Sequence, residues 1–290
     1  MDIRQLEYYI MVYEAGSFLR AAENSFISQQ GISNSVAMLE EEIGAKLFQR
    51  TRRGLIPTAS GETLYQFALA CTGGWNNYKA KIRGDRLEHS LRIGFDIGFM
   101  ELIPLSIFSE FYLIHPEEKI YIKNYVDECK ISLLKGEIDL GFCSLPVDPE
   151  LFDTLVESSR KVRLAVSKEN PLARRSSIRV SDLRDENLID IALNTPAQLY
   201  YRNICKLNRV EPNILLNASQ GKIIEELVSK NAAVSFFAGE DTWLPDSVVL
   251  LPFEDIDVSY GFQLLVRKNV VHTDLMTDFV RLLKQKLNAE

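Results

Sequence analysis

Residues 16–61 read GSFLRAAENSFISQQGISNSVAMLEEEIGAKLFQRTRRGLIPTASG, and their spacing sets the fold of the first part of the chain. Apolar residues recur there at intervals of four, three and four positions: Ile32, Val36, Leu39 and Ile43. This spacing puts them on one face of a helix. Gly16 ends an earlier helix, and the hydroxyls of Ser17 and Ser28 can each cap a helix that follows. The stretch therefore predicts three short helices with a serine-containing turn before the third, which is a helix-turn-helix unit.

The other face of the predicted third helix is polar at its N-terminal end. Its candidate DNA-contacting residues carry hydroxyls and amides: Ser28, Gln29, Gln30, Ser33 and Asn34. In a helix-turn-helix unit the third helix enters the major groove, where Gln and Asn amides pair with adenine and Ser bonds to several bases. Free N–H groups at the Ser28 end can also hold a phosphate. A small cap domain that binds no DNA is the alternative interpretation.

A β-ribbon is expected over residues 49–57, with a basic tip. Arg50, Arg52 and Arg53 form the densest basic cluster of the chain. These guanidinium groups can reach a flanking phosphate or the minor groove, or they can belong to a solvated turn without a partner. Residues 1–90 contain equal numbers of basic and acidic residues, so any DNA contact depends on this local patch.

Short motifs of this region occur together in one order and spacing: Gly16-Ser17-Phe18, Ala21-Ala22, Ser28-Gln29, Ile32-Ser33, Leu39-Glu40, Gly44, Leu47-Phe48-x-Arg50 and Thr58-Ala59-x-Gly61. Together they resemble the winged helix-turn-helix of the LysR-type transcriptional regulators. The resemblance implies a dimer or tetramer that binds a regulatory DNA site and responds to a small co-inducer. It also implies that Gln29 and Ser33 contact DNA, with Arg50 and Arg52 or Arg53 at the wing.

Three residues, in two places, depart from the family pattern. The family usually has Pro-Ala where this chain has Gln30-Gly31, and usually a basic residue where it has Asn34. Gly31 weakens the first helical turn by up to about 1 kcal/mol relative to alanine. Without a cation at Asn34 the helix loses one phosphate or guanine contact, so lower DNA affinity and a smaller salt dependence are expected.

A helix expected from Ser60 to about Arg86 carries one apolar stripe. Its apolar residues alternate by four and three positions: Leu64, Ala68, Cys71, Trp75, Tyr78 and Ile82. A long helix with one apolar face packs either on its own domain or on a second chain. The resemblance implies an antiparallel dimer, so the stripe residues other than Ala68 are expected at its interface. The pair Gly73-Gly74 is expected either to kink this helix or to let Trp75 of one chain approach the backbone of the other.

The remaining chain alternates strands and helices. They are expected in turn at residues 91–95, 104–114, 119–125, 129–135 and 138–142, and the alternation continues to a last helix at 273–287. This predicts α/β units around a largely parallel sheet. The resemblance extends to residues 134–141 and 170–173 and implies the fold of a periplasmic binding protein, with two α/β lobes and a cleft between them.

The predicted fold class is thus an N-terminal winged helix-turn-helix, a long linker helix and a two-lobed α/β effector domain. We expect the DNA-binding domain at residues 1–59, the linker helix at 60–88 and the effector-binding domain at 89–290. Within the last, lobe I is expected at about 91–161 and 267–290, and lobe II at about 162–266.

Ligands in open α/β sheets bind beyond the carboxyl ends of the strands. The loops at these ends hold the candidate effector-binding residues Asp96, Gly98, Val126, Asp127, Asn194, Thr195 and Phe237. In the family, two of these loops often hold a Ser or Thr hydroxyl against a ligand carboxylate, but the aligned residues Gly98 and Val126 have none. A simple carboxylate effector is therefore not expected unless backbone amides hold it. Asp96, Asp127 and Glu128 favour a cationic or hydroxyl-rich ligand, unless they are ordinary solvent-facing acids.

The composition is that of a globular protein, with 46% hydrophobic and 25% charged residues and a net charge of −7. No apolar run reaches the ~18 residues of a membrane span, and the N-terminus lacks the basic and apolar segments of a secretory signal. The four cysteines lack CxxC spacing, which fits a reducing cytosol. We expect a cytoplasmic protein without cofactor or metal, whose partners are double-stranded DNA, a small-molecule effector, further copies of itself and RNA polymerase.

Catalytic motifs are missing from the sequence. His89, His115 and His272 lie far apart without metal-ligand spacing, and no GxSxG elbow, Walker loop or GxGxxG follows a predicted strand. The expected function is sequence-specific transcriptional regulation controlled by a co-inducer. Two alternatives stay open: a two-lobed ligand-binding protein with weak or lost DNA binding, and an enzyme on the same two-lobed fold.

Overall fold

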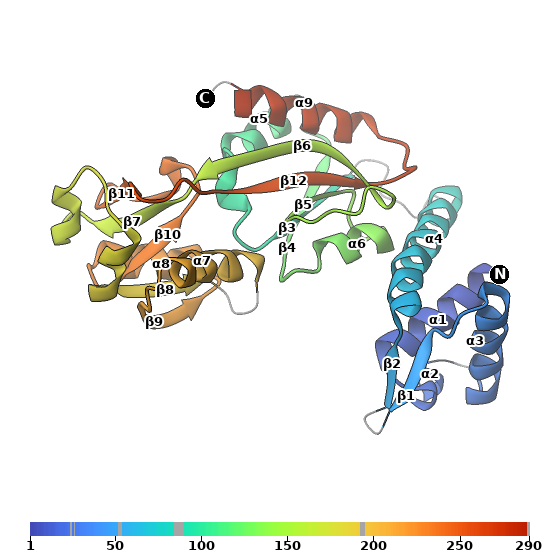
Figure 1. Ribbon diagram of the computed structural model, residues 1–290. Coiled ribbons are helices and arrows are strands. Elements are labelled where there is room, and N and C mark those ends of the chain that lie inside the picture. The colour runs from blue at the N-terminus through green and yellow to red at the C-terminus, as the bar shows by residue number, and fades with distance from the viewer. Residues whose placement is uncertain (24, 26, 52–53, 84–89, 192–194, 289–290) are drawn as a thin grey trace.

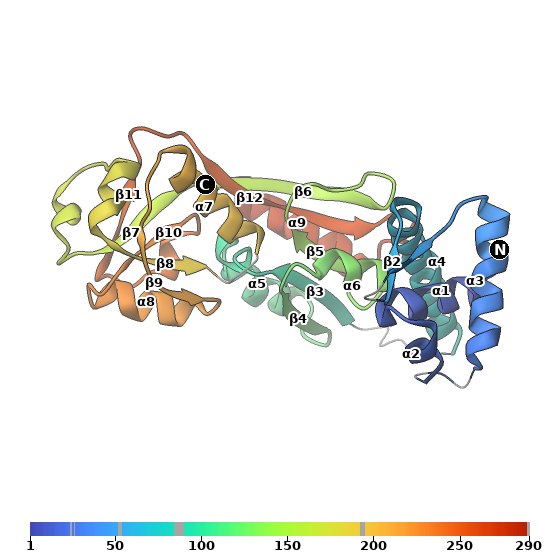
Figure 2. The ribbon, with the colours of Figure 1, turned by 60° about the horizontal axis from the view of Figure 1, so that its bottom comes forward.

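The computed structural model of the chain describes residues 1–23, 25, 27–51, 54–83, 90–191 and 195–288. An N-terminal helical unit is followed by one long helix and then by two α/β lobes (Figure 1). Lobe I lies between the N-terminal unit and lobe II, which occupy opposite ends of the molecule (Figures 1 and 2). The predicted fold class is confirmed.

The N-terminal unit consists of α1 (Ile3–Ala15), α2 (Phe18–Glu23), α3 (Gln29–Ile43) and the antiparallel ribbon of β1 (Phe48–Thr51) and β2 (Gly54–Pro57). The three predicted helices and the predicted ribbon are confirmed. Ala21, Ile32 and Val36 are buried in one small core, as their spacing predicts. Ile43 is exposed instead, because α3 ends there at Gly44, whose left-handed backbone (φ 74°) turns the chain.

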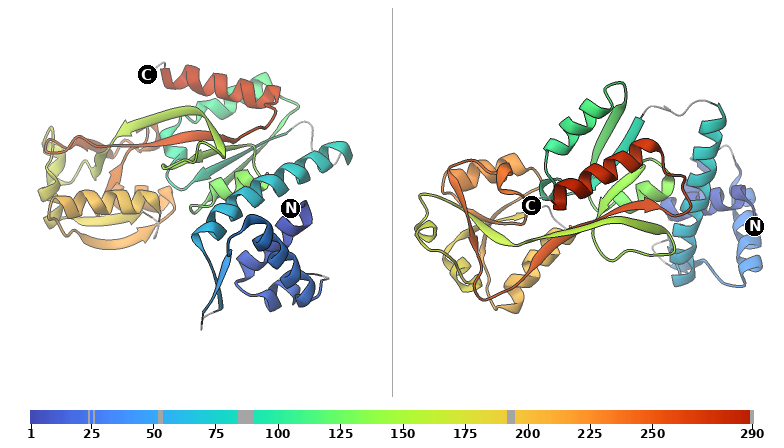
Figure 3. Two further views of the ribbon diagram at one scale, coloured as in Figure 1. Left: turned by 45° about the vertical axis from the view of Figure 1, so that its right-hand side comes forward. Right: turned by 90° about the horizontal axis from the view of Figure 1, so that it is seen from above.

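The long helix α4 (Ala59–Arg83) joins this unit to the lobes and measures about 37 Å along its axis. It runs unbroken through Gly73 and Gly74, so the kink that is one of the two alternatives for this pair is not observed (Figure 3). The reason is packing, since a Cβ atom on Gly73 would lie only 2.1 Å from the backbone oxygen of Leu134. This glycine therefore allows α4 to touch the backbone of lobe I and does not bend the helix.

Lobe I is built on a five-stranded sheet with the order β4-β3-β5-β12-β6. Its elements are β3 (Ser90–Asp96), α5 (Ser106–Ile114), β4 (Lys119–Tyr125), α6 (Cys129–Lys135), β5 (Leu140–Cys143), β6 (Phe152–Lys161), β12 (Ser259–Arg267) and α9 (Asp274–Asn288). β3 is parallel to β4 and β5, whereas β12 is antiparallel to both of its neighbours. Helices α5 and α9 cover one face of the sheet, and α6 lies on the other (Figure 1).

Lobe II is built on a second five-stranded sheet with the order β11-β7-β10-β8-β9. Its elements are β7 (Arg163–Ser167), β8 (Asn187–Ile191), α7 (Pro196–Leu207), β9 (Asn213–Ala218), α8 (Gly221–Ser229), β10 (Val234–Phe237) and β11 (Val248–Pro252). Strands β8, β9 and β10 are parallel, and β7 is antiparallel to β10 and β11. Short 3-10 helices lie at Met100–Leu102 (η1), Pro171–Arg174 (η2), Val180–Asp185 (η3) and Asp241–Trp243 (η4).

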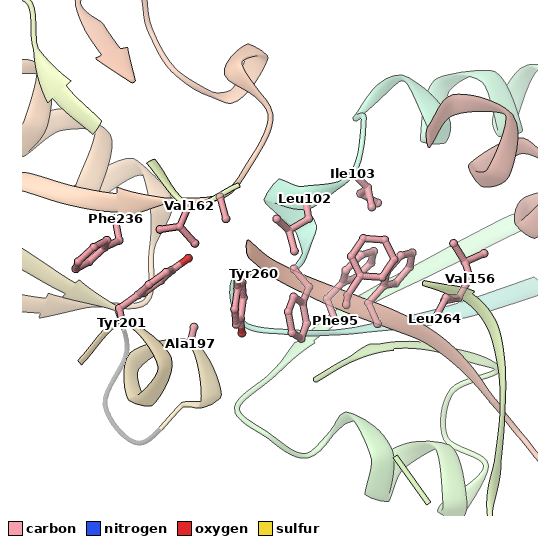
Figure 4. Packing of buried hydrophobic residues seen from close by; sticks show 14 of the residues in the cluster. Phe95, Leu102, Ile103, Val156, Val162, Ala197, Tyr201, Phe236, Tyr260 and Leu264 are labelled. Atoms are coloured by element: carbon pink, nitrogen blue, oxygen red, sulfur yellow. The ribbon is translucent and has the colours of Figure 1, made fainter. Parts of the chain in front are cut away.

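The chain crosses between the lobes twice, directly after β6 and directly before β12. The sequence predicts the return to lobe I at residue 267, but the whole of β12 pairs with β6, from Ser259 opposite Lys161 to Arg267 opposite Phe152. The boundary therefore lies at about residue 258, because residues 259–266 are bonded into the lobe I sheet. One apolar core continues through the junction, where the Tyr260 ring lies 5.3 Å from Phe99 and 5.6 Å from Tyr201 (Figure 4).

The N-terminal unit and α4 pack against lobe I of the same chain. Tyr65 and Leu69 of α4 share an apolar cluster with Leu133 of α6. The ammonium group of Lys135, at the end of α6, lies 2.9 Å from the carboxylate of Glu14 on α1. The same carboxylate oxygen accepts a hydrogen bond from the Tyr65 hydroxyl at 2.9 Å. Lobe I and the N-terminal unit are thus joined by apolar and charged contacts.

Leu64 and Cys71 belong to this intramolecular contact, although the sequence predicts both at a dimer interface. Both are half-buried against the same apolar cluster, because they lie on the side of α4 that packs against its own chain. Trp75, Tyr78 and Ile82, which the sequence also predicts at the interface, remain exposed on α4.

Candidate DNA interface and effector pocket

The first turn of α3 presents polar side chains to solvent. Ser28 caps the helix, and its hydroxyl oxygen accepts a hydrogen bond from the Gly31 N–H at 3.1 Å. Gln29, Gln30 and Asn34 are exposed, and Ser33 is half-buried. The predicted DNA-contacting residues of α3 therefore lie together on one end of the helix, opposite its buried apolar stripe.

Gln30 and Asn34, two of the three residues that depart from the family pattern, are bonded to each other. The Gln30 amide donates from Nε2 to Oδ1 of Asn34 at 2.8 Å, one helical turn away. A bidentate contact with adenine needs the donor and the acceptor of one amide. Because the Asn34 oxygen already accepts from Gln30, the pair presents a shared surface, with the Gln30 oxygen as acceptor and the Asn34 nitrogen as donor.

The wing is fixed against the turn between α1 and α2. The Leu55 N–H donates to the backbone oxygen of Gly16 at 3.1 Å, and a Cβ on Gly54 would lie 3.1 Å from the same oxygen. Arg50 is exposed on β1, opposite Leu55 in the ribbon. Arg52 and Arg53, the other basic candidates, lie outside the described residues.

An exposed apolar stripe follows the outer side of α4. It consists of Phe67, Trp75, Tyr78 and Ile82, which are 42%, 44%, 59% and 68% exposed. The rings of Trp75 and Tyr78 stack at 6.3 Å. Phe67 does not belong to the apolar stripe predicted from the sequence. That stripe includes Leu64 and Ala68, which face the core of the same chain.

A cavity of about 300 Å³ opens between the lobes, at the carboxyl ends of β8, β9 and β10. Lobe I contributes four of the lining residues: Ile97, Gly98, Glu101 and Leu102. Lobe II contributes the remainder: Ala165, Ile191, Tyr201, Ala218, Ser219, Gly221, Lys222, Ile224, Glu225, Val228, Ser235, Phe236, Phe237, Ala238, Gly239, Trp243 and Leu244. The cavity lies where ligands of open α/β sheets bind, and its wall is mainly apolar.

The predicted effector residues only partly meet at this cavity. Gly98 and Phe237 line it, and Asn194 lies outside the described residues. Val126 is exposed away from the cavity. Asp127 lines a separate hollow of about 520 Å³, which extends to Pro196 at the start of α7.

Asp96, at the end of β3, and Thr195 each bond through the side chain to the start of a helix, and neither lines the cavity. The Asp96 carboxylate is buried and accepts a hydrogen bond from the Cys129 N–H at the start of α6, at 3.2 Å. Burial raises the pKa of Asp96 to about 6. Thr195 caps α7 and accepts from the Gln198 N–H at 3.2 Å. The sequence Thr195-Pro196 carries this signal, since an N-cap threonine followed by proline marks a helix start.

The cavity is lined by three charged residues that the sequence does not predict there, namely Lys222, Glu225 and Glu101. Lys222 and Glu225 form an ion pair with each other, and Glu101 differs from both. Its Oε2 atom is buried and has no hydrogen-bond partner among the described residues. Burial raises the pKa of Glu101. The signal was an isolated glutamate in an apolar run, since Phe99, Met100, Leu102 and Ile103 surround it in the sequence.

Contacts between the lobes close one wall of the cavity. The Glu240 N–H of lobe II donates to the Glu101 backbone oxygen at 3.0 Å. Arg160, on the crossing strand β6, lies 2.7 Å from the Glu240 carboxylate and donates to the Leu102 oxygen at 3.3 Å. The Trp243 indole donates to the Ile103 oxygen at 3.4 Å. The closure of this wall of the cavity therefore depends on the relative orientation of the two lobes.

The described part of the chain contains no cluster of three His, Cys, Asp or Glu side chains that could hold a metal ion. Within the same residues, no helix combines the length and the apolar character needed to cross a membrane.

Family comparisons match both halves of the molecule. Residues 3–62 match the bacterial regulatory helix-turn-helix protein, lysR family, and residues 84–288 match the LysR substrate binding domain. Relatives include the HTH-type transcriptional regulator AlsR of Bacillus subtilis (strain 168), at 31% identity over 245 residues, covering 81% of this chain and 80% of AlsR. The Hca operon transcriptional activator HcaR of Escherichia coli (strain K12) is 25% identical over 296 residues, covering 99% of this chain and 98% of HcaR.

Solved structures share the fold over the whole length. Full-length BenM superposes with a TM-score of 0.57 at 23% identity, covering 98% of this chain and 96% of BenM. HinK, a LysR family transcriptional regulator from Pseudomonas aeruginosa, gives a TM-score of 0.57 at 21% identity, covering 99% of this chain and 98% of HinK. The chain belongs to the LysR family and is a DNA-binding transcriptional regulator with an effector-binding domain.

Proposed function

We propose that the protein binds its regulatory DNA through the start of α3 and the wing, and that a small molecule in the interlobe cavity controls this binding. The observation that carries the proposal is the cavity itself, because both lobes line it at the carboxyl ends of parallel strands. A ligand that contacts both walls binds one relative orientation of the lobes better than another. The protein itself is not an enzyme in this proposal.

Within the DNA interface, Gln29 and Ser33 contact base edges, and the Ser28 end of α3 holds a phosphate. Gln30 and Asn34 act as one bonded pair, and Arg50, Arg52 and Arg53 contact phosphates or the minor groove. The exposure of Gln29, Gln30, Asn34 and Arg50 supports these roles.

We also propose that two chains pair through the outer stripe of α4, formed by Phe67, Trp75, Tyr78 and Ile82. Exposed aromatic and branched side chains on a long helix favour an apolar partner. Pairing brings two N-terminal units onto two half-sites, which compensates for the nearly neutral charge of each unit. A change in lobe orientation then alters the spacing of these units, the shape of the bound DNA and the access of RNA polymerase.

Capture of DNA tests the proposal. The purified protein is incubated with sheared DNA from its own source, and the recovered fragments are sequenced and retested at several salt concentrations. We expect enrichment of an intergenic fragment, lost in the variant R50A/R52A/R53A. The matched control removes three exposed cations of lobe II, in K168A/R174A/K206A, and should keep the enrichment.

A second candidate is a ligand-binding protein with weak or lost DNA binding. The Gln30–Asn34 bond favours it, because it occupies an amide oxygen that base recognition would otherwise use. Absence of enrichment at low salt, with ligand binding retained, would support this candidate and contradict the proposed function.

A further inference from the structure

We infer that the interlobe cavity takes a compact amine, whose ammonium group is held by the Glu101 carboxylate and whose apolar body fills the remaining space. The inference rests on the proposed function, in which this cavity is the effector site. It adds the chemical class of the effector.

The backbone of Glu101 is held between the lobes, and one of its carboxylate oxygens has no hydrogen-bond partner among the described residues. Its backbone oxygen accepts the Glu240 N–H at 3.0 Å, which anchors the residue between the lobes. Its Oε2 atom is buried without a hydrogen-bond partner among the described residues. A buried polar oxygen costs free energy until a donor satisfies it, and an ammonium group supplies both donors and the opposite charge.

No described lining residue offers a free cation for a carboxylate ligand. Lys222 lies 2.5 Å from Glu225, and its side chain is 87% exposed, so it points into solvent and is already paired. Near the lobe junction, Arg160 is paired with Glu240 and Arg163 with Asp241. An anionic ligand would therefore face Glu101 without compensation, which disfavours it.

The rest of the cavity suits a small aromatic or aliphatic body. Phe236, Phe237 and Trp243 contribute aromatic surface to its wall. Aromatic faces also attract an ammonium group. The volume of about 300 Å³ equals that of roughly ten water molecules, at about 30 Å³ each, so the ligand has on the order of ten non-hydrogen atoms.

The position of Glu101 also links this ligand to the lobe orientation. Glu101 belongs to η1 in lobe I, yet its Oε1 atom lies 3.5 Å from where a Cβ on Gly221 of lobe II would be. An amine bound to Glu101 therefore has lobe II directly beside it. Such a ligand stabilises the orientation in which the two walls are close.

Calorimetric titration of the full-length protein with three probes of matched size tests the inference: 2-phenylethylamine, 2-phenylethanol and phenylacetate. We expect the amine to bind at least about tenfold more tightly than the acid, with the alcohol between them. Glu101→Gln should weaken amine binding by about tenfold or more and remove the preference over the acid. Glu118→Gln, at a half-buried glutamate of lobe I outside the cavity, should change neither affinity.

Ala218→Leu, which adds three carbon atoms to the cavity wall, should weaken amine binding, and unchanged far-UV circular dichroism and thermal unfolding would show that the variants fold. The inference is wrong if the acid binds as tightly as the amine, if Glu101→Gln leaves the preference intact, or if none of the probes binds. An amine affinity that Ala218→Leu leaves unchanged also contradicts it. The proposed function is tested separately, since it fails if no DNA fragment is captured or if Ala218→Leu leaves effector control of DNA binding unchanged.

Discussion

The role of a polar side chain in this protein depends on whether its polar atoms already form a hydrogen bond within the chain. The Asn34 oxygen accepts from Gln30, and the Asp96 oxygen accepts from Cys129, whereas the Glu101 Oε2 atom is buried without a bonded partner among the described residues. All three are polar residues at predicted functional positions or close to them. Their environments give them different roles.

Asn34→Arg should restore the cation that the family usually has at this position. We expect DNA affinity to rise about tenfold at low salt and the log–log salt slope to steepen by about one, because one more phosphate is neutralised. Fluorescence anisotropy with the captured fragment measures both quantities. The control Gln285→Arg adds the same charge on the exposed side of α9, and an equal gain there would show that position 34 has no special role.

Asp96→Asn should remove a pH dependence of stability. Burial raises the pKa of Asp96 from 3.8 to about 6, so between these values the folded chain binds more protons than the unfolded chain. The contribution of Asp96 to the free energy of unfolding is fully present below pH 3.8. It is lost as the pH rises through about 6, by up to about 3 kcal/mol. Asparagine keeps an acceptor for the Cys129 N–H and does not ionise in this range.

Urea unfolding from pH 4 to pH 7 measures this effect. The free energy of unfolding of the native protein, minus that of Asp96→Asn, should fall as the pH rises. Parallel curves would contradict the assignment, and Asp153→Asn, at an exposed carboxylate, serves as the control.

For single residues, the sequence predicted solvent exposure more accurately than it predicted functional role. Gln29, Gln30 and Asn34 follow directly from helical spacing and are exposed. Gly98 and Phe237 follow from strand ends and line the cavity. Whether an acid or hydroxyl near a strand end faces a ligand or caps a neighbouring helix depends on tertiary packing, which spacing does not contain.

Among the elements, α4 and α6 form the contact on which the arrangement of the halves depends. Gly73 lies against the backbone of Leu134 and Lys135, and Arg267 donates to the Leu134 oxygen at 3.2 Å. A side chain at Gly73 would have to displace backbone atoms. The neighbouring Gly74 has open space around its Cβ position.

Gly73→Ala should therefore destabilise the protein, although alanine is the better helix former. Its Cβ would lie 2.1 Å from the Leu134 oxygen and 2.8 Å from the Lys135 carbonyl carbon, and overpacking of this kind costs about 1–3 kcal/mol. Gly74→Ala should stabilise by up to about 1 kcal/mol. Urea unfolding of both variants gives the comparison, and equal shifts would contradict the close contact.

Elements with a strong pattern could be predicted closely from the sequence, and strands with a weak pattern could not. The ranges 119–125 and 129–135 predicted from the sequence match β4 and α6. β6 and β9 were not predicted as strands, because each alternates weakly between polar and apolar residues. The predicted seam of α4 mixed two sides of the helix, since Leu64 packs inward and Tyr78 faces solvent.

The whole molecule is a row of three bodies, with lobe I between the DNA-binding unit and lobe II (Figure 1). The outer stripe of α4 is free in the single chain, and the proposed pairing through it determines how many DNA-binding units act together. A neutral unit gains DNA affinity mainly from this multiplicity.

Tyr78→Glu with Ile82→Glu should halve the mass of the assembly and lower DNA affinity by about a hundredfold or more, because charges enter an apolar contact and bivalent binding is lost. Sedimentation equilibrium and anisotropy measure the two effects. The control pair Leu207→Glu and Val271→Glu alters exposed apolar residues elsewhere. An unchanged mass in the first variant would show that the chains pair through another surface.

The pairing of β6 with β12 makes lobe II an insertion between two adjacent strands of lobe I. Lys161 and Ser259 are direct partners in the sheet, so the chain leaves lobe I and returns to it at neighbouring points. Segments with such adjacent ends are exchangeable between homologous proteins by two joins. The lobe II wall of the effector cavity can thus be exchanged by replacing residues 162–258, whereas Ile97, Gly98, Glu101 and Leu102 stay with lobe I. The DNA-reading half, docked on lobe I, keeps its own chain and its own contacts.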